Sequence, residues 1–113
     1  MSELDKLIGA VEAGTLPEAV FHGCSSIRGH WAYTTGLDAE KRTLVFLAYN
    51  GSLDAALALH KALLPGWGWA RLNDRMAVEL AGSIYSARGP CPARAWLIAI
   101  LRAYRTAQRE AGE

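Results

Sequence analysis

The sequence predicts a small α+β domain in which helices come first, a three-stranded antiparallel meander follows, and a long helix closes the chain. Three observations predict this class: apolar residues recur at helical spacing in the first half, residues 67–88 alternate, and residues 95–101 form an unbroken apolar run. A chain of 113 residues, 51% of them apolar and 20% charged, fits a single domain over residues 1–113.

Two helices are predicted at the start of the chain. Ser2 followed by Asp5 resembles a capping box, apolar residues then recur at helical spacing, and Gly14 supplies a stop. These signals indicate a helix over residues 3–13. The capping signal repeats directly afterwards with a proline in the first turn, so a short second helix is predicted at about residues 16–23.

Residues 23–37 are the least regular stretch, since glycine, serine and threonine punctuate them. They are predicted to form a loop, or a weak strand around residues 31–35. Three large side chains lie in this stretch, His30, Trp31 and Tyr33. They either plug the core from the loop or face a partner.

Residues 38–49 fit two structures. Asp38 is a good helix N-cap, whereas residues 43–47 have the composition of a short buried strand, which periodicity cannot distinguish from a helix. Asn50 and Gly51 follow directly, a pair typical of a helix C-terminus. The helix is therefore favoured, and the strand stays open as the alternative.

The helix over residues 53–64 has the clearest signals. Ser52 is placed to cap it, Asp54 in its first turn complements the macrodipole, and Pro65 with Gly66 ends it. Its predicted apolar stripe consists of Leu53, Ala56, Leu57, His60, Leu63 and Leu64. A histidine on such a stripe is expected at the edge of the core, bonded to a backbone carbonyl.

A meander of three strands is predicted next, at about residues 67–73, 75–81 and 84–88. Asn73 with Asp74, and Gly82 with Ser83, provide the turns between them. Alternation places Trp67, Trp69 and Arg71 on one face of the first strand. The inward orientation of this face is favoured, because two tryptophans cost much to leave in water. An outward orientation would make it a hot spot for a protein partner.

The final helix is predicted over about residues 92–110, with Pro92 near its first turn. It is apolar around much of its circumference as far as Leu101, so it should be wedged between two layers. From Arg102 it becomes polar and basic, which suits a helix C-terminus. This helix and the one over residues 53–64 are the natural covers for the sheet.

Charge is nearly balanced overall but uneven along the chain. The formal net charge is +1, which argues against a nucleic-acid surface and against a mimic of DNA. Residues 1–20 carry four carboxylates against one lysine, and residues 88–113 carry five arginines against two glutamates. These segments can pair within the molecule, pair head to tail between copies, or stay solvated, which is the favoured interpretation.

No pattern points to catalysis, a metal or a cofactor. His22, Cys24, His30 and Cys91 lack the close paired spacing of zinc ligands, and no third group marks a nucleophile with its base. The prediction is a protein that is not an enzyme and binds no metal or cofactor. Two isolated cysteines, an acidic N-terminus and no long apolar run predict a cytoplasmic protein without a membrane span.

Two stretches, residues 48–67 and residues 92–103, with a short β region between them, resemble small proteins of phages and prophages. The chain looks like the phage α-β-α sandwich domain group of alphaproteobacterial phages. The resemblance covers residues 48–104, and residues 1–47 match less clearly. The matching residues are mostly packing residues, so the resemblance implies a fold and carries no shared activity.

The resemblance and the absence of chemistry together predict a phage-derived accessory protein that works by binding. A host protein is the expected partner, with a bacterial defence complex such as a CRISPR effector as the most specific candidate. The alternatives are an assembly protein working as a homo-oligomer and a weak single-stranded nucleic-acid binder. The candidate partner-binding residues are His30, Trp31, Tyr33, Trp67, Trp69, Arg71 and Arg75.

Overall fold

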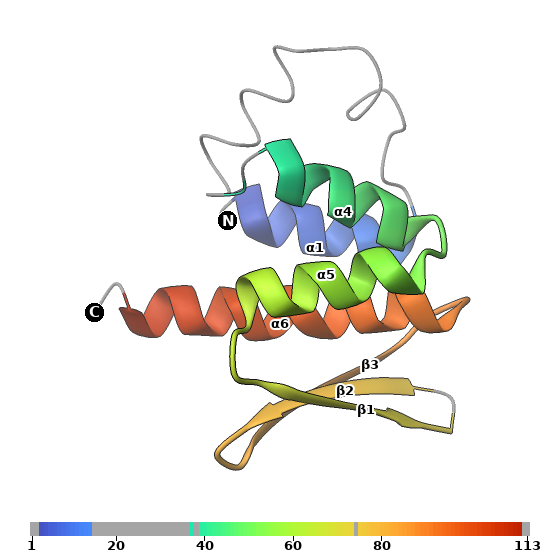
Figure 1. Ribbon diagram of the computed structural model, residues 1–113. Coiled ribbons are helices and arrows are strands. Elements are labelled where there is room, and N and C mark those ends of the chain that lie inside the picture. The colour runs from blue at the N-terminus through green and yellow to red at the C-terminus, as the bar shows by residue number, and fades with distance from the viewer. Residues whose placement is uncertain (1–2, 15–36, 38, 74, 112–113) are drawn as a thin grey trace.

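The computed structural model describes residues 3–14, 37, 39–73 and 75–111 (Figure 1). Their elements are α1 (Glu3–Ala13), α4 (Ala39–Tyr49), α5 (Leu53–Leu63), β1 (Gly68–Leu72), β2 (Arg75–Leu80), β3 (Ser83–Arg88) and α6 (Pro92–Ala111). The predicted α+β class with a three-stranded antiparallel sheet is confirmed. The helix predicted over residues 16–23 lies outside the described residues.

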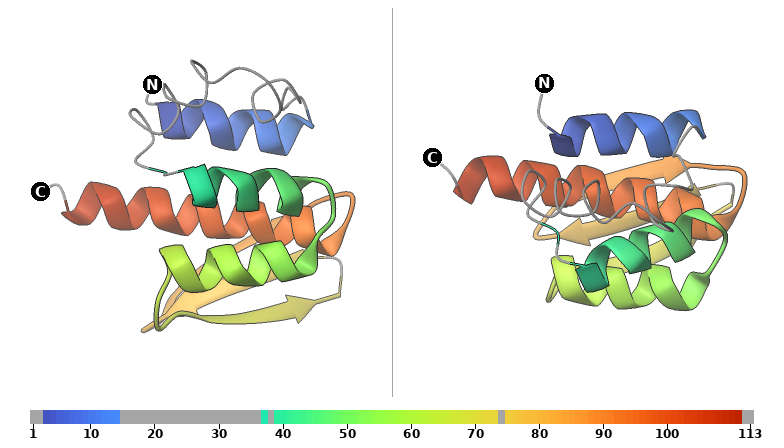
Figure 2. Two further views of the ribbon diagram at one scale, coloured as in Figure 1. Left: turned by 45° about the horizontal axis from the view of Figure 1, so that its top comes forward. Right: turned by 90° about the horizontal axis from the view of Figure 1, so that it is seen from above.

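The described helices all lie on one side of the sheet, whose strand order is β1-β2-β3. Helix α6 lies against the sheet, and α1, α4 and α5 pack around α6 (Figure 1, Figure 2). The opposite face of the sheet has no described helix over it. We call the side facing α6 the inner face and the other side the outer face.

Residues 39–49 form a helix, so the favoured interpretation of this stretch is confirmed. Its C-terminus is closed by Gly51, which has a positive φ of 108°. The amide of Gly51 donates to the carbonyl of Ala48, and that of Ser52 donates to the carbonyl of Leu47. This is the Schellman pattern, in which glycine avoids the clash that a Cβ would cause.

Helix α5 begins where the sequence predicts, because the Ser52 side chain accepts a hydrogen bond from the amide of Ala55. The predicted stripe is partly wrong. Leu53 is 49% exposed, and its place in the core is taken by Ala55 and Leu59. The buried side of α5 is set by its contacts with both α4 and α6. The hydrophobic periodicity of one helix gives a single apolar stripe and does not show where two neighbouring helices will pack.

The meander has the predicted strands and one turn shifted by a residue. The second turn is formed by Ala81 and Gly82, with φ values of 50° and 89°, and Ser83 already belongs to β3. Two successive residues with positive φ are typical of a type I′ hairpin, whose twist suits the flanking strands. Asn73, with φ of 47°, begins the first turn, and Asp74 lies outside the described residues.

Helix α6 is the centre of the core. Every residue from Ala95 to Leu101 is buried, which confirms that this run is wedged between two layers. The sheet contacts it on one side, and α1, α4 and α5 contact it elsewhere on its surface. None of the described helices combines the length and the apolar character that crossing a membrane requires.

Gly89 lies between β3 and α6, where the connecting chain passes very close to the backbone of the first turn of α6. A Cβ at this position would lie 2.9 Å from the backbone nitrogen of Ala95 and 3.2 Å from its Cα. Backbone atoms inside a helix cannot move aside as a flexible side chain can. The absence of a side chain here therefore fixes how α6 begins beneath the sheet.

Candidate interaction surface

Trp69 and Arg71 lie on the inner face of β1. In the strand pairing they stand opposite Val78 and Met76, which are 0% and 3% exposed. The Trp69 ring lies 4.6 Å from that of Trp96 on α6, centroid to centroid. The inward orientation is therefore confirmed for Trp69, although β1 is at the sheet edge and leaves this side chain 49% exposed.

Trp67 is also turned toward the protein. It is partly buried, and its ring lies 6.0 Å from that of Tyr85, which belongs to the inner face of β3. Its carbonyl is hydrogen-bonded to His60 and its ring packs against Tyr85, so both its backbone and its side chain have partners within the chain. Trp67 is a packing residue and offers little to a partner.

His60 links three elements from a position that is 2% exposed. The indole Nε1 of Trp96 lies 3.3 Å from Nδ1 of His60, and an indole N–H only donates, so Nδ1 accepts. The proton must then sit on Nε2, which donates to the Trp67 carbonyl at 2.9 Å. The predicted core-edge histidine bonded to a backbone carbonyl is confirmed, and both ring nitrogens have structural roles.

Arg71 shares the inner face of β1 with Trp69, whereas Arg75 lies apart from the tryptophans. Arg75 is paired with Leu72 and Arg88 and lies on the outer face, whereas Arg71 lies on the inner face. Both contribute to the lining of an open pocket of about 210 Å³, together with Cys91 and Pro92 at the start of α6. Of the candidate residues in the strands, Trp69 and Arg71 therefore stay together on the inner face and Arg75 is on the outer face. His30, Trp31 and Tyr33 lie outside the described residues.

Apart from Arg75, none of the predicted partner-binding residues that the structure describes lies on the outer face of the sheet. Three rows of residues cross it, paired strand to strand as Leu72–Arg75–Arg88, Ala70–Ala77–Ser86 and Gly68–Glu79–Ile84. The residues of the middle row have small side chains. Leu72 is 49% exposed and Ile84 is 62% exposed. The alternation of residues along the strands already separates the two faces of the sheet. It does not show which face α6 covers, so the outer face could not be recognised from the sequence alone.

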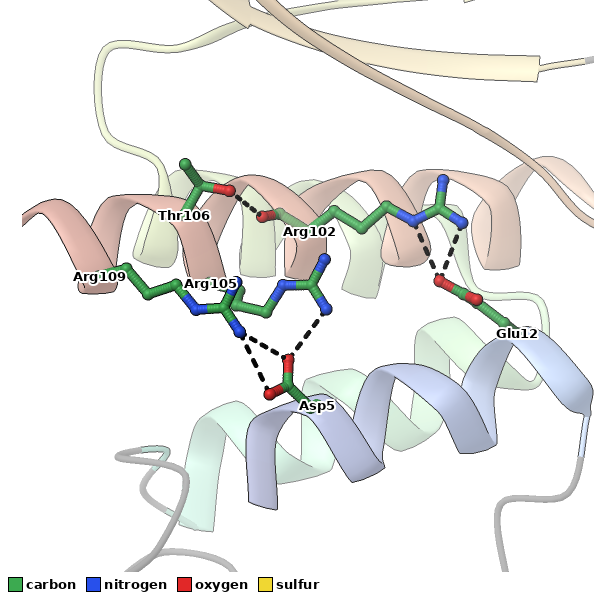
Figure 3. Close-up of polar contacts among 6 residues, drawn as sticks. All are labelled: Asp5, Glu12, Arg102, Arg105, Thr106 and Arg109. Carbon is green, nitrogen blue, oxygen red and sulfur yellow. Dashed lines mark hydrogen bonds and ion pairs between the residues drawn. The ribbon is translucent and has the colours of Figure 1, made fainter. Parts of the chain in front are cut away.

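The acidic first helix and the basic last helix pair within the chain (Figure 3). Arg105 and Arg109 both reach the Asp5 carboxylate, at 2.9 and 3.3 Å, and Arg102 contacts Glu12 at 2.9 Å. Of the three arrangements that the charge pattern allowed, the intramolecular one is present. The favoured interpretation, two separately solvated faces, is wrong, because burial of the apolar side of α1 against α6 brings the charges together.

Arg94 closes the C-terminus of α4. Its Nε and Nη2 donate to the Tyr49 carbonyl at 3.1 and 3.0 Å, and the guanidinium lies 4.0 Å from the centre of the Tyr49 ring. The last carbonyls of a helix lack partners within the helix, so this side chain satisfies one of them. The arginines of α6 are thus engaged in holding the helices together.

Cys91 has a free, partly exposed thiol in the lining of the pocket. Within residues 3–14, 37, 39–73 and 75–111, no three histidine, cysteine or acidic residues come together as a possible metal site. Cys24, the other cysteine of the sequence, lies outside these ranges.

No protein-family model, curated protein or solved structure matches this chain. The resemblance to phage sandwich domains therefore stays a prediction. The geometry defines a class of protein: a small α+β protein whose open sheet has the described helices on one side and a partly apolar face on the other.

Proposed function

We propose that this chain is a non-enzymatic accessory protein of phage origin that binds another protein through the outer face of its sheet. The supporting observation is the exposure of Leu72 and Ile84 on a face over which no described helix lies. An antiparallel sheet that faces water normally carries polar side chains there. Exposed apolar side chains interspersed with charges are common in protein interfaces.

The charged residues of the outer face are arranged asymmetrically. Arg75 and Arg88 lie in the row of Leu72, and Glu79 lies in the row of Ile84. One end of the face is basic and the other carries a carboxylate, so a partner with the opposite arrangement is favoured in one orientation. Such a surface acts by covering part of its partner and does not require chemistry.

The proposed partner is a host protein in the bacterial cytoplasm, and a defence complex such as a CRISPR effector is the most specific candidate. This part of the proposal comes from the resemblance to phage proteins. Assembly as a homo-oligomer is the alternative, because β1 is an edge strand. A single-stranded nucleic-acid binder is disfavoured, since Arg94, Arg102 and Arg105 are engaged within the fold.

Affinity capture from a host lysate tests this proposal. The wild-type chain should capture one stoichiometric protein, and the double variant Leu72→Glu, Ile84→Glu should lose at least about tenfold of that binding. The matched control is Leu53→Glu on α5, which changes an equally exposed leucine on the helical side. The proposal fails if no stoichiometric protein is captured, or if the double variant and the control bind alike.

A further inference from the structure

We infer that two copies of this chain pair through β1, antiparallel and centred on Ala70, so that two three-stranded sheets join into one. The strand order makes β1 an edge of the described sheet, and all five of its residues are exposed. An edge strand presents backbone N–H and C=O groups that a further strand can satisfy. This inference concerns the chain alone and does not depend on the proposed host partner.

The pleat of β1 limits how it can pair with itself. Directly opposed residues of an antiparallel pair lie on the same face, so inner residues must face inner residues. Trp69 and Arg71 are the inner residues of β1. A symmetric pair can therefore be centred only on Trp69, Ala70 or Arg71, because a one-residue shift would mix the two faces.

Only the centre at Ala70 uses the whole strand. It places Gly68 opposite Leu72 of the second copy and so pairs every residue of β1. A centre at Arg71 pairs three residues and sets two guanidinium groups against each other, which is unfavourable. A centre at Trp69 also pairs three residues and runs into Trp67, whose carbonyl and ring are engaged with His60 and Tyr85.

The register centred on Ala70 is also complementary in side-chain chemistry. It sets Trp69 of each copy opposite Arg71 of the other, and the two-fold symmetry makes this contact twice. Trp69 is held by its contact with Trp96 and keeps 49% of its surface exposed. A guanidinium over such an indole gains a cation–π contact. In a single chain both side chains are exposed on the edge strand, so pairing removes exposed aromatic surface.

This pairing has a consequence for the outer face. The two-fold axis at Ala70 runs perpendicular to the sheet, so both copies of α6 lie on one side and both outer faces lie on the other. The three rows that cross one sheet continue into the second copy. A dimer would therefore present one continuous surface twice as wide, able to engage a two-fold symmetric or repeating partner.

Cysteine cross-linking tests the register. In a Cys24→Ser, Cys91→Ser background, Ala70→Cys places a thiol opposite its own copy, where opposed Cα atoms lie about 4.5–5.5 Å apart, within disulfide range. Mild oxidation should convert most of the chain to a covalent dimer. The control is Leu72→Cys on the same strand and face, whose Cα would lie about 13 Å from its equivalent. It should not cross-link, whereas a mixture of Gly68→Cys and Leu72→Cys should.

Light scattering of the purified chain gives the second readout. A dimer mass should appear at micromolar to submillimolar concentration, and Arg71→Glu should weaken dimerisation at least about tenfold by removing both cation–π contacts. Arg88→Glu on the far strand is the matched control and should dimerise normally, with thermal unfolding confirming that both variants fold. A monomer at all these concentrations, or equal cross-linking of Ala70→Cys and Leu72→Cys, would overturn the inference.

Discussion

At the scale of single residues, His60 does more than fill a gap in the core. It accepts from Trp96 and donates to Trp67, so one neutral imidazole joins α5, α6 and the chain entering β1. The sequence predicts a histidine bonded to a backbone carbonyl. It does not predict the second bond, because Trp96 lies 36 positions further along the chain.

Replacing His60 should be costly. His60→Leu keeps an apolar side chain but leaves the buried Trp96 N–H and Trp67 carbonyl without their partner, which should reduce the free energy of unfolding by about 2–4 kcal/mol. Urea unfolding measures the loss. The adjacent Lys61→Ala, an exposed change on the same helix, should stay within about 0.5 kcal/mol of wild type. Equal stability of the two variants would contradict this role.

Gly89 and Gly9 provide a matched pair. Gly89→Ala should lower the free energy of unfolding by about 1–3 kcal/mol, because its Cβ meets the α6 backbone at 2.9 Å. Gly9→Ala meets nothing within 4 Å on the exposed surface of α1 and should raise it by about 0.5–1 kcal/mol. Thermal unfolding of both variants shows whether each substitution raises or lowers the stability of the protein. A stabilised Gly89→Ala would show that the start of α6 can move away.

At the scale of elements, local sequence signals predicted where most helices and strands begin and end. Which of their faces are buried depends on tertiary packing. Ser52 and Gly51 mark ends of α5 and α4 because caps act through hydrogen bonds a few residues away. Leu53 was misplaced because burial depends on which neighbours a helix meets. The outer face was missed for the same reason, since alternation separates two faces without saying which one a helix covers.

The contact between α1 and α6 yields a prediction at this scale. Asp5 is 16% exposed and accepts from two arginines, so Asp5→Asn should reduce the free energy of unfolding by about 1–2 kcal/mol. Glu12→Gln, at a carboxylate 37% exposed, should cost less than about 1 kcal/mol. Unfolding should be compared at low and high salt. A loss for Asp5→Asn no larger than that for Glu12→Gln would contradict the account.

At the scale of the whole molecule, the order of elements and the buried position of α6 were predictable, but the placement of the described helices on one side of the sheet was not. A meander followed by a long apolar helix indicates a sheet packed on that helix, and α6 has this place. Both predicted covers lie on one side, with α6 against the sheet and α5 beside α6, so the other face remains without a described helix. That asymmetry leaves Leu72 and Ile84 exposed on the face opposite the helices, on the two edge strands of the sheet.

The most direct test of binding through the outer face is thiol labelling of the chain alone and in complex with its captured protein. In the Cys24→Ser, Cys91→Ser background, Ile84→Cys reports the outer face and Leu53→Cys reports the helical side. Complex formation should slow alkylation of Ile84→Cys at least about tenfold, because a partner that covers the outer face shields this side chain from the reagent, and leave Leu53→Cys unchanged. Protection of Leu53→Cys with free labelling of Ile84→Cys would place the partner on the helices and contradict the account.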